Sequence, residues 1–497
     1  MDARDYHDRP RARALTPCGR TRREFLWEAG GGFVGTALTT LLAEDGFFAR
    51  SAAAADAGPS VAGALAPKPP HFPARAKACI VLFMYGGVSQ VDTFDPKPEL
   101  ARYSGQPLPT LDSDPVLKAR KPGTLLGSSR RFRQCGQAGI AISDLYPHLA
   151  RCLDDLAVIR SMYTDTFAHG SGLLQMNTGF LRQGYPSLGS WVTYGLGTVN
   201  QNLPGYVVLL DHRGGPISGP PNWGAGFMPA TYQGTQFRTS GDPVLNLSPP
   251  QGITAAQQRN QLDLLARLSR PQGGAGAGRD NSELMARIAS YELAFRMQAT
   301  APEAVAIASE PAETRRLYGL DHPRTERFGR RCLLARRLVE RGVRFVQVYS
   351  GGGHGDENWD AHSDVNKNHE LHCGETDQPI AGLLIDLKRR GLLDETLVVW
   401  TSEFGRTPTG QGRTGRDHSA RGFTAWLAGG GVRGGQAYGM TDEFGYAAIE
   451  NKVHVHDLHA TILHLLGFDH TLLTYFHGGR DMRLTDVHGR VVRELLA

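Results

Sequence analysis

Cysteine is scarce in this sequence, and its charges nearly cancel. The 497 residues include only six cysteines, which are widely spaced and form no Cys-x-x-Cys pair. That count excludes a disulfide-stabilised scaffold and is typical of buried thiols. Lysine and arginine exceed aspartate and glutamate by only five, so the composition gives no reason to expect a nucleic-acid partner. The 61 glycines have no three-residue period, which excludes collagen, and 40% hydrophobic residues exclude a disordered chain.

The N-terminal region has the order of an export signal rather than that of a folded domain. The pair Arg22-Arg23 precedes a weakly apolar, glycine-rich stretch at 30–42, and small residues follow at 51–55. This order is typical of a twin-arginine secretory signal. The apolar stretch is shorter than the roughly 18 residues of a membrane span, and no later run approaches that length. We therefore expect residues 1–55 to be a signal peptide for the twin-arginine export machinery, with a linker at 56–76. The expected location is the periplasm or cell envelope.

Short apolar runs typical of buried strands alternate with amphipathic helix patterns along the rest of the chain. The strand-like runs are 78–84, 156–159, 206–210, 343–349, 397–400 and 423–427, and the helix patterns are 281–299, 328–341 and 379–390. This alternation predicts an α/β fold, a three-layer α/β/α sandwich with a largely parallel mixed sheet, over residues 77–490. Residues 211–280 are rich in glycine and proline and have little periodicity. We expect them to form an insertion or lid.

Histidine is concentrated in the C-terminal part of the chain. Twelve of the 18 histidines lie between residues 354 and 488. Histidine is the commonest metal ligand and the side chain that titrates near neutral pH. The concentration therefore predicts a metal site or an acid–base site in this region.

Three motifs in that region lie beside predicted strands. Asp360 and His362 follow one strand, Glu403 and Arg406 follow the next, and His418 immediately precedes a third. In open parallel sheets, ligands bind at the carboxyl ends of the strands. Carboxylate and imidazole groups are suitable zinc ligands, and an arginine can clamp an anionic oxygen with two hydrogen bonds. Asp417, next to His418, could orient that imidazole.

A further histidine pair lies near the C-terminus. His454 and His456 alternate just before an apolar helical pattern, and Asp457 follows them. The alternation is compatible with a metal pair. We favour a structural interpretation, with Asp457 as the N-cap of the helix.

Five stretches resemble a known family. Residues 86–95, 359–362, 403–408, 415–418 and 455–461 are similar to the exported domain-of-unknown-function family number 1501, within the alkaline-phosphatase-like superfamily. The resemblance covers roughly residues 75–490. It implies a mixed-sheet α/β/α sandwich that hydrolyses phosphate or sulfate esters at one or two divalent metal ions.

The resemblance also implies ligands for those ions. Asp360, His362 and His418 would hold one ion, and Asp92, or alternatively Asp95, would hold a second together with Glu403. Zinc is the expected metal because the donors are mixed nitrogen and oxygen, and manganese, iron and calcium are the alternatives. Arg406 would neutralise charge in the transition state.

The nucleophile is the open part of this comparison. In the superfamily the nucleophile precedes a Thr-Gly pair by about ten residues. Here that count ends at His169, which could be a ligand or form a phosphohistidine. Ser171 and Thr166 are nearby hydroxyl alternatives for the nucleophile. The chain has no Cys-x-Pro-x-Arg or Ser-x-Pro-x-Arg motif, so the formylglycine route of common sulfatases is not expected.

Three functions are compatible with this sequence. The leading hypothesis is an exported metal-dependent hydrolase of phosphate or sulfate esters, with a small-molecule or glycan ester as substrate. One alternative is a degenerate hydrolase fold that binds anionic glycans or a partner protein at the envelope without turnover. The other is a metal-dependent phosphomutase. In each case the expected type of reaction is inferred mainly from the resemblance in fold.

Overall fold

The computed structural model describes residues 64–109, 114–239, 243–244, 247–249, 251–268, 282–353 and 355–497. The predicted signal peptide at 1–55 lies outside these residues. Of the predicted linker, residues 64–76 are described, and they follow the surface of the domain. The Arg75 and Ala76 amides donate hydrogen bonds to the Leu465 carbonyl, and Ala76 is buried. Within the described residues, no helix combines the length and apolarity that crossing a membrane requires.

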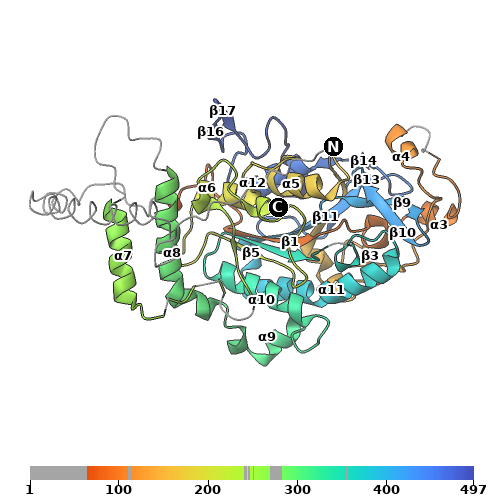
Figure 1. Cartoon of the computed structure of the whole chain (residues 1–497). Helices are drawn as coiled ribbons and strands as arrows, with labels where there is room; N and C mark the ends of the chain where they lie inside the picture. Colours follow the sequence, from red (N-terminus) through yellow and green to blue (C-terminus); the bar gives the residue numbers. More distant parts are fainter. Residues whose placement is uncertain are drawn as a thin grey trace, which may run out of the picture. The chain divides into compact units, whose positions relative to one another are not determined.

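One large sheet organises the domain (Figure 1). Its strands are ordered β12-β4-β11-β8-β1-β7-β5-β6, and β15 also pairs with β4. In the same order, the strands are β12 Gln436–Tyr438, β4 Leu156–Tyr163, β11 Phe423–Ala428, β8 Thr396–Thr401, β1 Ala78–Met84, β7 Phe345–Ser350, β5 Tyr206–Leu209 and β6 Thr235–Gln236, with β15 at Val453–His454. Only β11 runs antiparallel to its neighbours β4 and β8. The predicted α/β fold with a largely parallel mixed sheet is therefore confirmed.

The centre of the sheet consists of three strands that are buried along their whole length. Every residue of β1, β7 and β8 is buried, which explains why their sequences are nearly continuous apolar runs. β1 is parallel to both of the others, and its residue Phe83 pairs with Tyr349 on one side and Thr401 on the other. The three strands therefore end side by side, and their following loops meet at one edge of the sheet.

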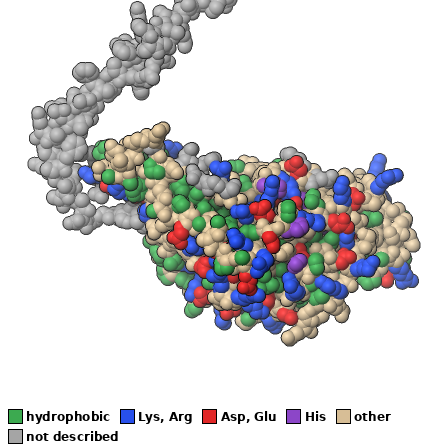
Figure 2. All heavy atoms as spheres, turned by 90° about the horizontal axis from the view of Figure 1, so that it is seen from below, with side chains coloured by type: hydrophobic (Ala, Val, Ile, Leu, Met, Phe, Trp, Pro, Cys, Tyr) green, Lys and Arg blue, Asp and Glu red, His purple; other side chains and the backbone are tan. Residues whose placement is uncertain are grey.

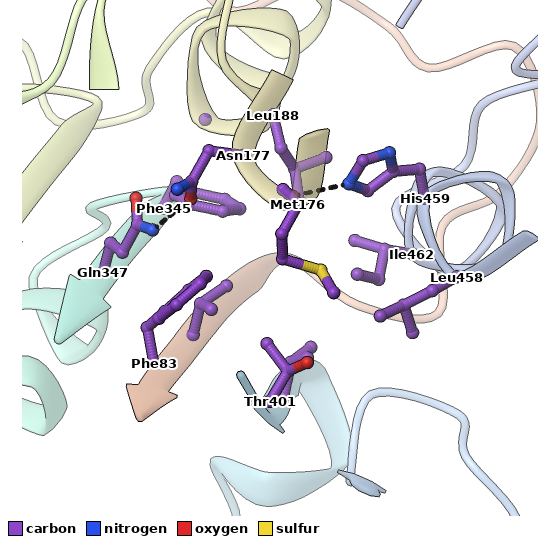
Figure 3. A pocket seen from close by; sticks show the side chains of 13 residues that line it. Phe83, Met176, Asn177, Leu188, Phe345, Gln347, Thr401, Leu458, His459 and Ile462 are labelled. Atoms are coloured by element: carbon purple, nitrogen blue, oxygen red, sulfur yellow. Dashed lines mark hydrogen bonds between the residues drawn. The ribbon is translucent and has the colours of Figure 1, made fainter. Parts of the chain in front are cut away.

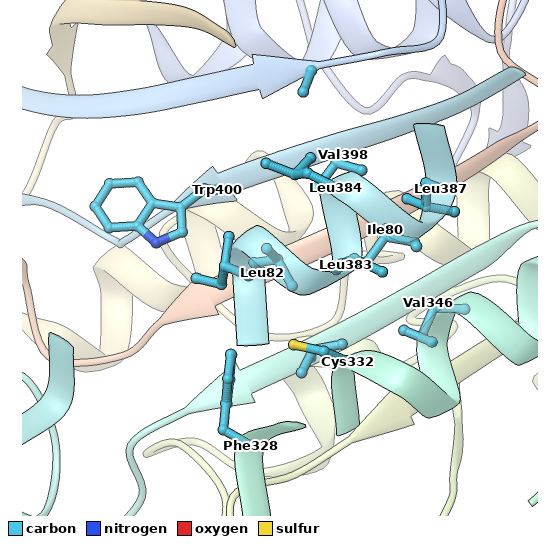
Figure 4. Packing of buried hydrophobic residues seen from close by; sticks show 14 of the residues in the cluster. Ile80, Leu82, Phe328, Cys332, Val346, Leu383, Leu384, Leu387, Val398 and Trp400 are labelled. Atoms are coloured by element: carbon cyan, nitrogen blue, oxygen red, sulfur yellow. The ribbon is translucent and has the colours of Figure 1, made fainter. Parts of the chain in front are cut away.

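Helices cover both faces of the sheet (Figure 1). One layer contains α10 (Glu326–Glu340) and α11 (Val365–Arg389), and the other contains α5 (His169–Thr178), α6 (Leu188–Leu196) and α12 (Val455–Leu465). Alternate residues of β1 belong to two separate hydrophobic clusters, with Ile80 and Leu82 in one and Val81 and Phe83 in the other. Figure 4 shows the first cluster, in which β1 packs against α10 and α11. This is the predicted three-layer sandwich.

The remaining elements are short or peripheral. The helices are α3 Pro98–Arg102, α4 Pro115–Ala119, α7 Ala255–Leu268, α8 Ser282–Ala304 and α9 Ala312–Leu317. The strand pairs are β2 Phe132–Cys135 with β3 Ile140–Ser143, β9 Gly405–Gln411 with β10 Gly415–Ser419, β13 Met440–Thr441 with β14 Ala448–Glu450, and β16 Tyr475–His477 with β17 Arg480–Met482. The five described cysteines are unpaired, and four of them are buried, as the sequence predicts.

Two elements differ from the sequence expectation. Helix α11 begins at Val365, well before the predicted start at residue 379, because the Asp364 side chain caps it by accepting hydrogen bonds from the Asn366 and Lys367 amides. Its first half is polar in sequence, yet it buries His369, His372 and Cys373 among other residues. Helix α7 also forms within the predicted insertion, where only Leu262 is buried. The polar first half of α11 lacks the apolar periodicity that identifies a helix in sequence.

Candidate metal centre

Four side chains converge at the edge of the sheet where β1, β7 and β8 end. His169, Asp360, His362 and His418 each place a ligand atom within 4.8 Å of the others. Asp360 and His362 belong to the loop between β7 and α11, His418 to the β9–β10 hairpin, and His169 to the first turn of α5. Three of these residues are the predicted first metal site. The structure adds His169, which the sequence suggested either as a ligand or as a nucleophile.

The Asp360 carboxylate is the centre of this group. Its Oδ1 lies 2.8 Å from His362 Nε2 and 3.0 Å from His418 Nε2, and its Oδ2 lies 3.3 Å from His169 Nε2. Burial alone would raise the pKa of Asp360. The three adjacent imidazoles and the charge of Arg406 outweigh burial and hold that pKa well below its usual range. Asp360 is therefore an ionised, oxygen-donating group.

The outer nitrogen of each imidazole is fixed by an oxygen acceptor. Nδ1 of His169 donates to Glu403 Oε1 at 2.7 Å, and Nδ1 of His418 donates to the Phe167 carbonyl at 2.8 Å. Nδ1 of His362 contacts Gln411 Oε1. A neutral imidazole that donates from Nδ1 has its lone pair on Nε2. All three Nε2 atoms face Asp360, which is the arrangement in which outer hydrogen bonds orient metal-binding histidines.

Two further observations fit a cation at this point. Nε2 of His169 is buried and lies 3.3 Å from Asp360 Oδ2 without a well-aligned hydrogen bond. Nε2 of His362 lies only 2.9 Å from Nε2 of His418, although both outer hydrogen bonds direct a lone pair there. Two lone pairs that face each other repel unless a proton or a cation lies between them. Three nitrogen donors and one carboxylate form a donor set that zinc and related divalent ions accept.

Glu403 lies behind this group rather than in it. Its side chain is fully buried, it accepts hydrogen bonds from the Gly86 amide at 3.0 and 3.2 Å, and it holds His169 Nδ1. Glu403, which the sequence predicted as a metal ligand, thus orients His169 instead. Gly86 is required here because its φ is +123° and a Cβ would lie 2.6 Å from the Trp359 amide nitrogen.

Asp92 is outside the group as well. Its carboxylate lies 2.7 Å from Arg416 Nε and accepts a hydrogen bond from Ser89 Oγ at 2.6 Å. Burial would raise the pKa of Asp92, but the Arg416 charge lowers it to about 2. The alternative, Asp95, contacts Lys97 at 3.1 Å and Thr441. Among the described residues no second group of metal-binding side chains forms. The structure therefore does not bring Asp92 and Glu403 together as the expected second pair of ligands.

Arg406 is buried beneath Asp360. Its guanidinium donates to Asp360 Oδ1 at 2.6 Å and to the carbonyls of Gly87 at 2.8 Å, Arg416 at 3.0 Å and Gly86. Because its donors are used by the protein, we now assign Arg406 to the positioning of Asp360. Asp417, expected to orient His418 from beside it, bonds to the His418 amide and pairs with Arg120.

The hydroxyl alternatives for the nucleophile lie at the start of α5. Ser171 Oγ is 3.0 Å from Thr166 Oγ1 and 3.3 Å from the Ala168 carbonyl. Neither hydroxyl has a hydrogen bond to a member of the four-residue group. Burial would lower the pKa of His169, but its hydrogen bonds to Asp360 and Glu403 raise that pKa to about 9.

Helix α5, which carries His169, is held at its other end by α12. Nε2 of His459 donates to the Met176 carbonyl at 2.8 Å (Figure 3), and Nε2 of His456 donates to the Gly179 carbonyl at 2.7 Å. The C-terminal histidines therefore have the structural role that we favoured. The predicted cap is displaced by three residues, because His454 is the N-cap of α12 and Asp457 completes a capping box from within the helix.

Several features of this centre have no signal in the sequence. Gln411 and the Phe167 carbonyl orient two ligands, yet neither belongs to a recognisable motif. The sequence predicts only a loop before a strand in the region where the β9–β10 hairpin, which carries His418, forms. Solvent reaches the group mainly at His362, whose side chain is 34% exposed, against 14–16% for the other three.

Comparisons with known proteins give a family and distant structural similarities. No curated protein matches the sequence. The lipoteichoic acid synthase LtaP from Listeria monocytogenes matches with 10% identity and a TM-score of 0.32, over 85% of this chain and 78% of that chain. The PsFucS1 sulfatase from Pseudoalteromonas sp. matches with 13% identity and a TM-score of 0.33, over 80% and 69%. The alkaline phosphatase from the Antarctic bacterium TAB5 matches with 10% identity and a TM-score of 0.29, over 79% and 97%. The family model described as a protein of unknown function, DUF1501, matches residues 76–496, so the chain belongs to the DUF1501 family.

Proposed function

We propose that this protein is a metal-dependent hydrolase of phosphate or sulfate esters. The observation that carries the proposal is the convergence of three oriented imidazole nitrogens on one ionised carboxylate. The His362 side is open to solvent, so water could reach an ion held by these four ligands, and a zinc ion can expand to five-coordinate during catalysis. A divalent ion, with zinc the first choice, would polarise the ester oxygen and lower the pKa of a water molecule.

The protein's own residues have separable tasks in this proposal. Asp360, His169, His362 and His418 hold the ion. Glu403 and Gln411 fix two of the imidazole rings, and Arg406 holds the Asp360 carboxylate from below. The positive N-terminal end of α5 lies beside the group through His169, and it favours an anionic ester at that position.

Direct attack by water is the mechanism that best fits these residues. His169 is committed to Asp360 and Glu403, and Ser171 has no adjacent base that would activate it. We therefore propose hydrolysis without a covalent intermediate on the protein: water adds to phosphorus or sulfur, and the alcohol leaves with a proton.

Metal content and ester hydrolysis test this function together. The protein is purified without chelators, its metals are counted by mass spectrometry, and it is assayed with p-nitrophenyl phosphate, bis-p-nitrophenyl phosphate and p-nitrophenyl sulfate. We expect one ion per chain and turnover of at least one ester. Both should be lost in the Asp360→Ala/His418→Ala double variant and kept in His322→Ala, which changes an exposed histidine.

The rival functions give different results in the same assays. A protein that binds metal and anionic glycans but hydrolyses none of the three esters would be a binding protein, and this outcome would refute the proposed hydrolase. The burial of Arg406 is the observation that favours this rival, because its donors bond to the protein and it is not free to clamp an anion. A phosphomutase would move phosphate within a sugar phosphate without releasing it.

We also propose that the protein is exported. The basis is the order of charged, apolar and small residues in residues 1–55. The test compares the periplasmic fraction for the natural chain and for an Arg22→Lys/Arg23→Lys variant. Equal amounts in the periplasm would contradict the twin-arginine route.

A further inference from the structure

Arginine is concentrated in one segment that the metal centre does not use. Residues 313–344 contain ten arginines, no lysine and four acidic residues. They form α9, α10 and the turns around them. Figure 2 views the molecule from the side of these helices, where lysine and arginine side chains are numerous among acidic ones. Two of the arginines, Arg336 and Arg337, are buried and paired with Glu310, so structural pairing accounts for only part of the segment.

A cavity of about 300 Å³ opens beside the start of α10. Its charged lining consists of Arg324, Arg327 and Arg331, with His212 from the loop after β5 and Glu375 from α11. Such a volume exceeds that of a single water molecule many times over. Three guanidinium groups around one hollow are unfavourable for each other unless an anion compensates them.

Arg331 supplies an unused donor at this cavity. Its side chain is 3% exposed, Nη1 donates to the Leu210 carbonyl at 3.1 Å, and Nη2 pairs with Asp211 at 2.8 Å. Its Nε, however, is buried and has no hydrogen-bond partner. A buried donor without a partner destabilises the fold, so its persistence beside a polar cavity indicates a partner that enters from outside the chain.

The two other arginines also lack an acidic partner. Arg324 donates to the backbone carbonyls of Glu370 and Leu371, and its guanidinium lies against Gly374, where a Cβ would collide with it. Among the described residues, Arg327 has no ion pair or hydrogen bond through its side chain. Both arginines are exposed, so their guanidinium groups can turn toward a ligand.

The acidic groups at the cavity are already neutralised. Glu375 pairs with Arg213 through two contacts, one of 3.1 Å. Asp211 pairs with Arg331 and lies 3.3 Å from Arg213. Four arginines (213, 324, 327 and 331) therefore face two carboxylates (211 and 375), which leaves an excess of two positive charges before His212 is counted.

We propose that this cavity binds one tetrahedral oxyanion, a phosphate or sulfate group, between Arg324, Arg327 and Nε of Arg331. Arginine is suited to this task because its planar fork matches the paired oxygens of such groups. The cavity borders the loop that supplies the metal centre, since the Gly351 amide donates to Asp211 at 3.2 Å. The group is either a free ion or the anionic end of an ester; the shared chemistry is the tetrahedral oxyanion.

The first experiment measures sulfate binding in solution. Equilibrium dialysis with radioactive sulfate is carried out on the Asp360→Ala/His418→Ala protein, so that uptake at the metal centre does not contribute. We expect saturable binding of one ion that equal ionic strength of chloride does not abolish. Arg327→Gln should weaken it at least tenfold, the usual effect of losing a charged hydrogen bond (about 1.5–3 kcal/mol).

Two variants distinguish a specific binding site from non-specific electrostatic attraction of the anion to the arginine-rich surface. Arg330→Gln is the matched control, because it removes one charge from the same helix, from a side chain that lies 3.0 Å from Glu326, and it should change affinity less than twofold. Gly374→Ala keeps every charge but displaces Arg324, and it should weaken binding several-fold in a protein whose circular dichroism is unchanged. Equal effects of Arg327→Gln and Arg330→Gln would overturn the proposal.

The source of the anion is distinguished with an ester. If methyl sulfate displaces sulfate with an affinity within tenfold of that of sulfate itself, the result supports an anionic ester as the occupant. If it does not compete, the site takes only the free ion, and the ester is overturned as the source. A crystal soaked in selenate, with the anomalous signal located in this cavity, supports the proposal directly. Absence of that signal at saturating selenate overturns it. Neither result alters the metal content or ester turnover of the natural protein, so the two proposals fail independently.

Discussion

Glu403→Gln is the most informative single substitution in the metal centre. The natural carboxylate accepts hydrogen bonds from the Gly86 amide and from His169 Nδ1, and it is fully buried. Both donors approach Oε1, and the Gly86 amide also lies 3.2 Å from Oε2. Glutamine has nearly the same shape, but in either orientation its NH₂ group would lie against the Gly86 amide, as a buried donor without an acceptor. A buried donor left without an acceptor costs about 1–3 kcal/mol. We expect the metal-free protein to lose stability by that amount in denaturant unfolding.

The effect on metal binding follows from the same contact. If His169 turns, its Nε2 leaves the group around Asp360, and only three ligands remain oriented. Substitution of a residue that orients a ligand lowers metal affinity by roughly 10- to 100-fold, or about 1.4–2.7 kcal/mol. Competition with a chromophoric chelator measures this loss for zinc at fixed pH.

A matched control separates the effect of losing this particular carboxylate from the general effect of replacing a glutamate by a glutamine. Glu395→Gln makes the same substitution at an exposed residue, whose contact with Lys77 involves side chains that are 51% and 65% exposed. Surface ion pairs contribute little, so stability and zinc affinity should both stay near their natural values. Zinc affinity within twofold of the natural protein in Glu403→Gln would refute the assignment of Glu403 as the residue that orients His169.

Three other predictions follow from buried groups. Asp92→Asn leaves Arg416 buried without its partner, and we expect the free energy of unfolding in denaturant to fall by about 3–5 kcal/mol. The folded fraction should keep its metal. Loss of metal at unchanged stability would show instead that Asp92 is a ligand. Burial lowers the pKa values of His369 and His459 to about 3. As pH falls below about 6.5, the unfolded chain therefore takes up protons that the native protein does not, and stability should fall by about 2 kcal/mol per histidine between pH 7.5 and pH 5. A His459→Gln variant should show a shallower dependence in the same unfolding series, and an identical slope would contradict this reasoning. Gly86→Ala places a Cβ against the Trp359 and Asp360 backbone, so soluble folded protein should decrease sharply. Gly105→Ala is the control, because its φ is also positive (+87°) but a Cβ there meets nothing within 4 Å, and it should lose only about 1–2 kcal/mol of stability to backbone strain.

Local sequence patterns determined the framework of this protein. The continuous apolar runs of β1, β7 and β8 predict strands that are buried on both faces, because only a strand covered by helices on each side can hide every side chain. The carboxyl ends of such neighbouring strands meet, which predicts a site beside the loops that follow them. The family resemblance, rather than the strand pattern, grouped Asp360, His362 and His418 as ligands of one ion. Their residue types, rather than their exact contacts, identified the chemistry.

Tertiary structure decided the role of each residue within that framework. Glu403 and Asp92 are both acidic residues near strand ends, but Glu403 accepts from Gly86 and His169 while Asp92 pairs with Arg416. These partners are distant in sequence and leave no periodic signal. The same holds for Arg406, whose burial under Asp360 depends on carbonyls of two loops and of strand β10. A hydrogen bond needs a particular distance and direction between two groups, and only the packed chain fixes both.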